Sequence, residues 1–276
     1  MGESLWGGDE LDLDGYLARI GFTGTPRADL TTLRAVHRAH VAAFPFENLE
    51  ILLGRPVLLD VPALQDKMVT RRRGGYCYEQ NLLLAAALDR VGFSFTGLGA
   101  RVRMGSDSRR AVTHMALKVE ADGEQWLCDV GFGGEGLLEP LAFRDGIRER
   151  QGDWTFGIER EQKDVRVLRT LHPEGWFDLY AVGPEERFPV DYAVMNHYIS
   201  THPRSPFVSR PVVQQTESDH RRNLVGTVLT SARADGSRDA CEVGVEELPD
   251  VLSREFRIEL SAADAETLAR VYSSGP

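Results

Sequence analysis

Apolar residues in the first third of the chain recur every three or four positions, which is the spacing of a helix that buries one face. Leu13, Leu17 and Ile20 form one such set, and further sets follow at 30–41 and 61–70. Aspartates stand just before the second and third sets, where a side-chain oxygen can cap a helix. The pattern therefore predicts three helices ahead of position 71.

A fourth helix is expected where a glycine turn meets a run of leucines and alanines. From Leu82 to Val91 the chain has no proline or glycine, and Gly92 suits the C′ position, so we expect a helix from about Cys77 to Val91. Cys77 would lie in its first turn, where unpaired backbone N–H groups and the positive end of the helix dipole favour an anion. The thiolate should therefore form more easily there than in a free cysteine. The three arginines before the turn could form a solvated face, or one of them, paired with Glu47, could hold the turn in place.

The next part of the chain changes from helical to alternating periodicity, which indicates strands. Asp122 and Gly123 are a strong signal for a two-residue hairpin turn. With that turn, Ala116 lies opposite Asp129, so His114 and Asp129 share one face as diagonal neighbours. The carboxylate is then close enough to reach an imidazole nitrogen. The other face is wholly apolar and is expected to be the core: Met115, Leu117, Val119, Trp126, Cys128 and Val130.

Alternating segments recur later in the chain and are typical of further strands in a barrel or sandwich. They lie at 154–158, 165–171 and 176–182. After them, Asp191 is expected to cap another helix, and Ser261 is expected to begin a last helix in the manner of a capping box. The chain therefore combines helices with antiparallel strands.

The composition and charge of the chain argue against some classes of binding partner. The 276 residues carry 32 basic and 42 acidic side chains, and the net charge of −10 argues against a nucleic-acid surface and against a general attraction to anionic membranes. The N-terminal residues lack a signal-peptide pattern, and no apolar run approaches the ~20 residues that span a bilayer. We therefore expect a cytoplasmic protein that binds neither nucleic acid nor membrane.

Disulfide and metal chemistry are not indicated. Three cysteines are an odd number without a CxxC spacing, so neither a disulfide framework nor a zinc site is expected. His37 and His40 are three residues apart, but they lack an acidic or cysteine partner nearby. We expect no metal.

Cys77, His114 and Asp129 have the parts of a catalytic triad. In this interpretation Cys77 attacks an acyl carbon, and His114 holds the thiol proton in a thiolate–imidazolium pair. Asp129 fixes the imidazole tautomer and stabilises its charge. Backbone N–H groups, including that of Cys77, would stabilise the oxyanion. The alternative is that Cys77 is a small buried core residue, which is the interpretation we give to Cys128. Two glycines before Cys77 and polar residues after it favour the nucleophile.

Three stretches of this sequence resemble motifs of the arylamine N-acetyltransferase family. They are the segment from Arg73 to Asn81, Thr113-His114-Met115, and the segment from Asp129 to Gly134. The segments from Phe46 to Leu49 and from Ser200 to Phe207 match as well. The resemblance therefore covers most of the chain, and the sequence does not depart from it at the three triad positions.

The resemblance implies an α+β fold of three parts. Residues 1–91 would form a helical bundle that carries the thiol. Residues 92–190 would form an antiparallel β-barrel that carries the other two triad residues, and residues 191–276 would form an α/β lid. The Cys-His-Asp core would be similar to that of cysteine proteases and transglutaminases.

The resemblance also implies a ping-pong acetyl transfer. Acetyl-CoA would acylate Cys77, and an aromatic amine or hydrazine would then attack the thioester with its nitrogen. Three aromatic residues match family positions that line the substrate pocket, although each would also suit the core: Phe46, Phe132 and Phe207. The candidates for contacts with the CoA phosphates are Gly133, Gly134 and Arg204.

Three other functions are compatible with the same residues. An amide synthase would use the triad to close a macrolactam from a carrier-bound acyl chain. A hydrolase or transglutaminase-like enzyme has the same Cys-His-Asp order, and a binding module would keep the fold without catalysis. The sequence does not specify the amine, the acyl chain or the oligomeric state, so a homo-oligomer stays open.

Overall fold

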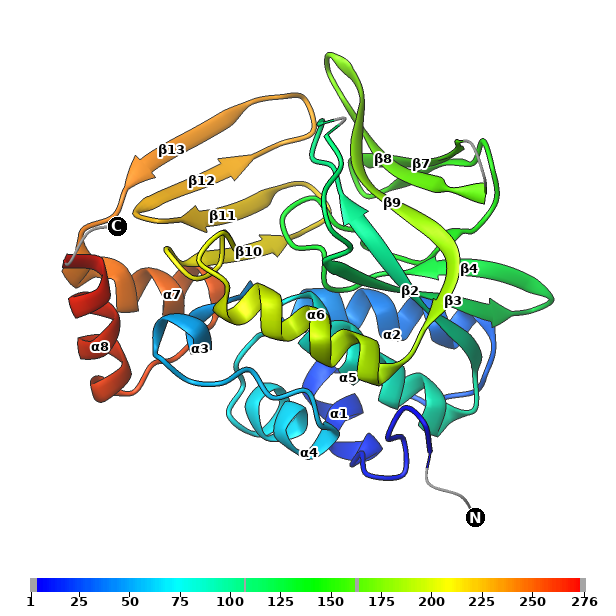
Figure 1. The fold of residues 1–276 in the computed structure, drawn as a ribbon, viewed down its shortest axis with the longest axis horizontal. Helices are drawn as coiled ribbons and strands as arrows, with labels where there is room; N and C mark the ends of the chain where they lie inside the picture. The colour runs from blue at the N-terminus through cyan, green and yellow to red at the C-terminus, as the bar shows by residue number, and fades with distance from the viewer. Residues whose placement is uncertain (1–3, 107, 162–163, 274–276) are drawn as a thin grey trace.

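The computed structural model describes residues 4–106, 108–161 and 164–273, and it has the expected α+β architecture (Figure 1). The N-terminal helices lie together at the bottom of this view. An eight-stranded and a five-stranded antiparallel sheet lie above them, and helix α6 passes in front. The C-terminal helices α7 and α8 lie beside the smaller sheet.

The four predicted N-terminal helices lie where the sequence places them, and a short helix, α3 (Leu49–Leu52), was not predicted. In chain order the helical elements are α1 (Leu13–Ile20), α2 (Leu30–Ala43), α3, α4 (Val61–Leu64), a π-helical segment (Gln65–Thr70) and α5 (Cys77–Val91). Asp29 and Asp60 cap α2 and α4 by accepting backbone N–H groups. Gly92 ends α5 with a φ of 98°, as its predicted C′ position requires. The helix predicted over 61–70 differs in its second half, where π geometry, which is frequent near functional sites, carries the buried Lys67.

The eight-stranded sheet is a nearly closed barrel. Its strands are β2 (Ser94–Val102), β3 (His114–Ala121), β4 (Glu124–Cys128), β5 (Leu141–Ala142), β6 (Arg148–Gln151), β7 (Trp154–Arg160), β8 (Arg166–His172) and β9 (Gly175–Arg187). The order is β5-β4-β3-β2-β9-β8-β7-β6, so β5 and β6 are the two edges. The side chain of Gln151 in β6 binds the segment just before β5, because it accepts from the N–H groups of Leu138 and Glu139 and donates to the carbonyl of Glu139.

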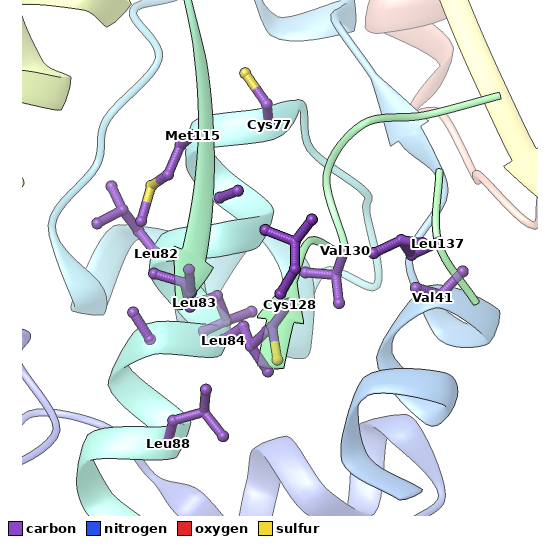
Figure 2. Packing of buried hydrophobic residues seen from close by; sticks show 14 of the residues in the cluster. Val41, Cys77, Leu82, Leu83, Leu84, Leu88, Met115, Cys128, Val130 and Leu137 are labelled. Atoms are coloured by element: carbon purple, nitrogen blue, oxygen red, sulfur yellow. The ribbon is translucent and has the colours of Figure 1, made fainter. Parts of the chain in front are cut away.

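The β3–β4 hairpin has the predicted register. Asp122 and Gly123 form the turn with φ angles of 52° and 79°, and Leu117 pairs with Cys128. That pair is the last of the ladder, so the predicted pairing of Ala116 with Asp129 does not form. The predicted core face is buried as expected, but the other face is also buried, because helix α5 and the rest of the barrel cover both sides. Figure 2 shows leucines of α5 packed beside Cys128 and Val130.

The C-terminal part contains α6 (Pro189–Thr201), β10 (Val212–Thr216), β11 (Arg221–Val225), β12 (Val228–Ala232), β13 (Arg238–Glu242), a 3₁₀ turn (Val245–Glu247), α7 (Leu248–Phe256) and α8 (Ala262–Ser273). Asp191 is not the N-cap of α6 as predicted, because the helix begins two residues earlier and the carboxylate accepts from the N–H of Phe188. Ser261 does cap α8, and its hydroxyl accepts from the N–H of Asp264.

The N-terminal part contributes one strand to the C-terminal sheet. Strand β1 (Phe46–Glu47) pairs with β10, and Phe46 also bridges to Gly75 in the glycine turn. The short strand therefore connects the start of α5 to the smaller sheet. The division of the chain at positions 91 and 190 stays a prediction. Among the described residues, no helix combines the length and the apolar character needed to cross a membrane.

Candidate active site

The glycine turn and a buried ion network fix the start of helix α5. A Cβ on Gly74 would lie 2.0 Å from the carbonyl oxygen of Pro45, so the chain can pass there only without a side chain. The N–H of Tyr76 donates to the carboxylate of Glu79 at 3.0 Å, which anchors the first turn of α5. Lys67 donates to the same carboxylate at 2.7 Å. The thiol of Cys77 thus starts from a rigid backbone.

The predicted pairing of an arginine with Glu47 is confirmed for Arg73. Its guanidinium donates to Glu47 at 2.9 and 3.1 Å and lies 3.2 Å from Glu50, and all three residues are buried. Burial raises the pKa of Glu47, but the cations Arg73 and Lys67 overcome this and hold that pKa at about 2. The network therefore contains an ionised carboxylate directly beneath the turn.

His114 and Asp129 meet as the hairpin register predicts. The Nε2 of His114 lies 2.7 Å from the carboxylate of Asp129, and the two residues are 3 % and 1 % exposed. The other carboxylate oxygen accepts from the Nδ2 of Asn81 and the N–H of Gly131, both at 3.0 Å. Burial raises the pKa of Asp129, but the His114 charge and these hydrogen bonds together hold it below its ordinary value. Because Nε2 faces Asp129, Nδ1 is the nitrogen left to exchange a proton with a substrate or thiol.

Cys77 borders the same cavity as His114. Both residues line one cavity of about 1230 Å³. The Sγ of Cys77 is 3.9 Å from the carbonyl oxygen of Thr113, and the backbone N–H of Met115 also reaches it. The sulfur therefore lies against the two residues that flank His114. Figure 2 shows Cys77 at one end of the packed cluster near Met115, whereas Cys128 lies deeper among the leucines.

Burial of Cys77 opposes the expected easy formation of its thiolate. Burial raises the pKa of the Cys77 thiol, and the negative charge of Asp129 raises it further. The backbone N–H groups of Met115 and Tyr78 act in the opposite direction but do not compensate. The argument from the start of the helix did not include this burial. His114 remains the group expected to accept the thiol proton.

The three predicted aromatic residues lie around this cavity. Phe46, Phe132 and Phe207 all line it, and the rings of Phe46 and Phe207 are 5.7 Å apart. The ring of Phe132 stands edge-on to that of His114 at 5.1 Å. An amine with an apolar ring would therefore find aromatic surface beside the imidazole. Their role as substrate contacts stays a prediction.

Two of the three residues predicted to contact the CoA phosphates line the cavity. Gly134 and Arg204 line the cavity, whereas Gly133 lines a smaller void that shares Phe46 and Phe132 with it. The N–H of Gly134 already donates to the side chain of Gln214 at 3.0 Å. Sequence reasoning missed the other cations of the cavity wall, because they are scattered over separate loops and strands: Arg110, Arg210, Arg221, Arg233 and Arg238. Only the fold brings them together.

Two supporting residues were also not identified from the sequence. His37 accepts the N–H of Asp129 at Nε2 and donates from Nδ1 to the carbonyl of Leu138. Burial lowers its pKa to about 4, so the ring is neutral at pH 7. Both of its nitrogens thus have hydrogen-bond partners, and the Nδ1 of His40 lies 2.9 Å from the hydroxyl of Tyr16. The signal for Asn81 was its position four residues after Cys77, on the same face of α5.

Comparison with known proteins agrees with the motifs and the geometry. A sequence model of the N-acetyltransferase family matches residues 29–265. The arylamine N-acetyltransferase of Mycolicibacterium smegmatis is 38% identical over 268 residues, which are 95% of this chain and 97% of that protein. The crystal structure of the Nocardia farcinica arylamine N-acetyltransferase has 46% identity and a TM-score of 0.91, with coverage of 96% and 95%. The Mycobacterium marinum enzyme, solved in complex with CoA, has 33% identity and a TM-score of 0.88, with coverage of 95% and 99%. The chain therefore belongs to the arylamine N-acetyltransferase family.

Proposed function

We propose that the protein transfers an acetyl group from acetyl-CoA to the nitrogen of an arylamine, an arylhydrazine or a similar amine, by a ping-pong mechanism through a thioester on Cys77. The main support is that Cys77 and His114 line one cavity and that His114 is hydrogen-bonded to the buried Asp129. A second support is the CoA complex of the related M. marinum enzyme.

In the first half-reaction, Cys77 forms a bond from sulfur to the acetyl carbon. The imidazole of His114 accepts the thiol proton at Nδ1, and Asp129 stabilises the resulting imidazolium through the 2.7 Å hydrogen bond. The thioester bond of the donor breaks, and the imidazolium returns the proton to the departing thiolate. Burial raises the pKa of the Cys77 thiol, so direct transfer of its proton to His114 helps to form the nucleophile.

In the second half-reaction, the amine nitrogen attacks the acetyl carbon on Cys77. His114 accepts a proton from that nitrogen, the bond from carbon to sulfur breaks, and the proton then restores the thiol. An arylamine is unprotonated at neutral pH and is therefore a ready nucleophile. Water would compete for the same thioester, and the aromatic lining formed by Phe46, Phe132 and Phe207 limits its access.

The cavity suits an anionic donor. Six arginines but only two glutamates, Glu135 and Glu174, are among the residues that line it, although the chain as a whole carries a charge of −10. Guanidinium groups bind phosphates well, so Arg204 and its neighbours are the groups we expect to hold those of CoA. A backbone contribution from Gly134 would require its hydrogen bond to Gln214 to open.

A reducing compartment such as the cytoplasm fits the free thiol that this mechanism needs. The three cysteines are unpaired in the structure, and Cys77 and Cys128 are buried. Cys241 is exposed and would be vulnerable to oxidation in an oxidising compartment.

Steady-state kinetics with acetyl-CoA and a panel of arylamines test the proposal. Double-reciprocal plots at several amine concentrations should be parallel, because the donor product leaves before the amine reacts. Cys77→Ala should abolish transfer while the circular dichroism spectrum stays unchanged, and retained turnover would reject Cys77 as the nucleophile. Negligible turnover with every arylamine would favour the amide synthase, and amine-independent peptide cleavage would favour the hydrolase.

A further inference from the structure

The β3–β4 hairpin lacks one rung at the active site. Its ladder runs from Ala121 and Glu124 at the turn to Leu117 and Cys128. Hydrogen-bonded pairs recur every second residue in such a hairpin, so the next one would join Met115 to Val130. In that pair the N–H of Val130 would donate to the carbonyl of Met115. That hydrogen bond is replaced in the structure.

The side chain of Asn81 occupies the position of the missing rung. Its Nδ2 donates to the carbonyl of Met115 at 2.9 Å, and its Oδ1 accepts from the N–H of Val130 at 3.2 Å. The second Nδ2 hydrogen is directed to the carboxylate of Asp129 at 3.0 Å. Asn81 is fully buried, and each of its polar atoms has a partner. The carboxamide of Asn81 therefore replaces a backbone hydrogen bond between Met115 and Val130.

This replacement has consequences for all three catalytic groups. The N–H of Met115, which would have bonded Val130, is free to reach the sulfur of Cys77 instead. Asp129 keeps one oxygen on Asn81 and the other on His114. Asn81 also lies four residues after Cys77, so both side chains project from one face of the rigid helix α5.

We infer that Asn81 is a positioning residue, which holds the hairpin open by one rung so that Asp129 faces His114 and the N–H of Met115 faces Cys77. The inference rests on the proposed function of the triad. The backbone at Gly131 also packs closely against helix α5, because a Cβ on Gly131 would lie 2.8 Å from both the Nδ2 of Asn81 and the Cα of Cys77. The carboxamide thus has one orientation, since the opposite one would place its oxygen against two other oxygens.

The test uses the full chain and the rate at which p-nitrophenyl acetate acetylates Cys77, followed by release of nitrophenol. Asn81→Ala should slow this step by about 10- to 100-fold, because small displacements of reacting groups cost rates of this order. Gln151→Ala is the matched control, since Gln151 is also a buried amide that joins two segments by three hydrogen bonds, but at the far edge of the barrel. The control should lose stability without slowing acetylation per folded molecule.

A double-mutant cycle separates positioning from a general structural effect. If Asn81 acts through Asp129, then Asn81→Ala should cost much less in an Asp129→Asn background than in the wild type. Equal costs in both backgrounds, or a Gln151→Ala variant that is slowed equally, would overturn the inference. Should Asn81→Ala fail to fold, Asn81→Asp keeps the shape but cannot donate to both oxygens, and an unchanged rate for that variant would also overturn it. A wild-type protein without acetylation of Cys77 would reject the proposed function instead.

Discussion

Replacing Arg73 by methionine should destabilise the protein by about 3 to 5 kcal/mol, which is the usual cost of leaving a buried charge without its partner. Arg73 is the main cation of Glu47, to which it donates at 2.9 and 3.1 Å, and it also contacts Glu50 at 3.2 Å. Arg73 and Glu47 are 3 % and 0 % exposed, so water does not replace the lost partner. Only Lys67, 3.6 Å from Glu47, would remain as its cation among the described residues.

The shifted pKa of Glu47 gives a similar magnitude for the loss in folding free energy. Burial raises this pKa, but Arg73 and Lys67 hold it at about 2 instead of the ordinary 4.5. A fall of that size corresponds to roughly 3 kcal/mol of folding free energy. Because the folded-state pKa is depressed, this stabilisation is complete above pH 4.5 and is lost as the pH falls towards 2. Most of this acid dependence should disappear in Arg73→Met.

Equilibrium unfolding in urea at pH 7 measures the difference. Arg71→Met is the control, since the same chemical change two positions away removes a side chain that is 45% exposed and pairs with Asp66 at the surface. That variant should lose no more than ~1 kcal/mol. Adding Glu47→Gln to Arg73→Met should recover part of the loss by removing the unpaired charge. Equal losses for the two arginine variants would refute the reasoning.

Three further changes test other parts of the site. Asp129→Asn should reduce kcat/KM for acetyl transfer by about 100-fold or more with an unchanged fold, because the imidazolium loses its compensating charge, and steady-state rates near wild type would contradict this. Gly131→Ala should reduce acetyl transfer and the thermal midpoint together, since its Cβ would lie 2.8 Å from the Cα of Cys77, and wild-type kinetics would show that the backbone has room. Burial lowers the pKa of His37 from 6.5 to about 4, so roughly 3 kcal/mol of stability should be lost between pH 6.5 and 4. Urea unfolding over that range should show a smaller change for His37→Gln, and identical profiles would contradict this assignment.

The parts of the fold that follow from neighbouring residues were predictable from the sequence. The caps Asp29 and Asp60, the end of α5 at Gly92 and the hairpin register all depend on residues a few positions apart. The register placed His114 beside Asp129 because a two-residue turn fixes every pair that follows it.

The parts that depend on distant segments were not predictable in this way. The raised pKa of Cys77 comes from burial by the barrel, which no local pattern reports. Gln214, which takes the N–H of Gly134, lies eighty positions away in the sequence. The hydrogen-bond ladder of the hairpin ends one pair early because Asn81 of helix α5 takes the place of the next pair. The sequence of the hairpin alone could not reveal this early end.

Mass spectrometry after brief exposure to acetyl-CoA alone tests the central claim most directly. With no amine present, the account predicts that the wild-type protein gains one acetyl group, found on the peptide that contains Cys77 and lost again when an arylamine is added. The peptides with the buried Cys128 and the exposed Cys241 should stay unmodified. An unmodified Cys77 peptide, or an acetyl group that an arylamine does not remove, would contradict a thioester route.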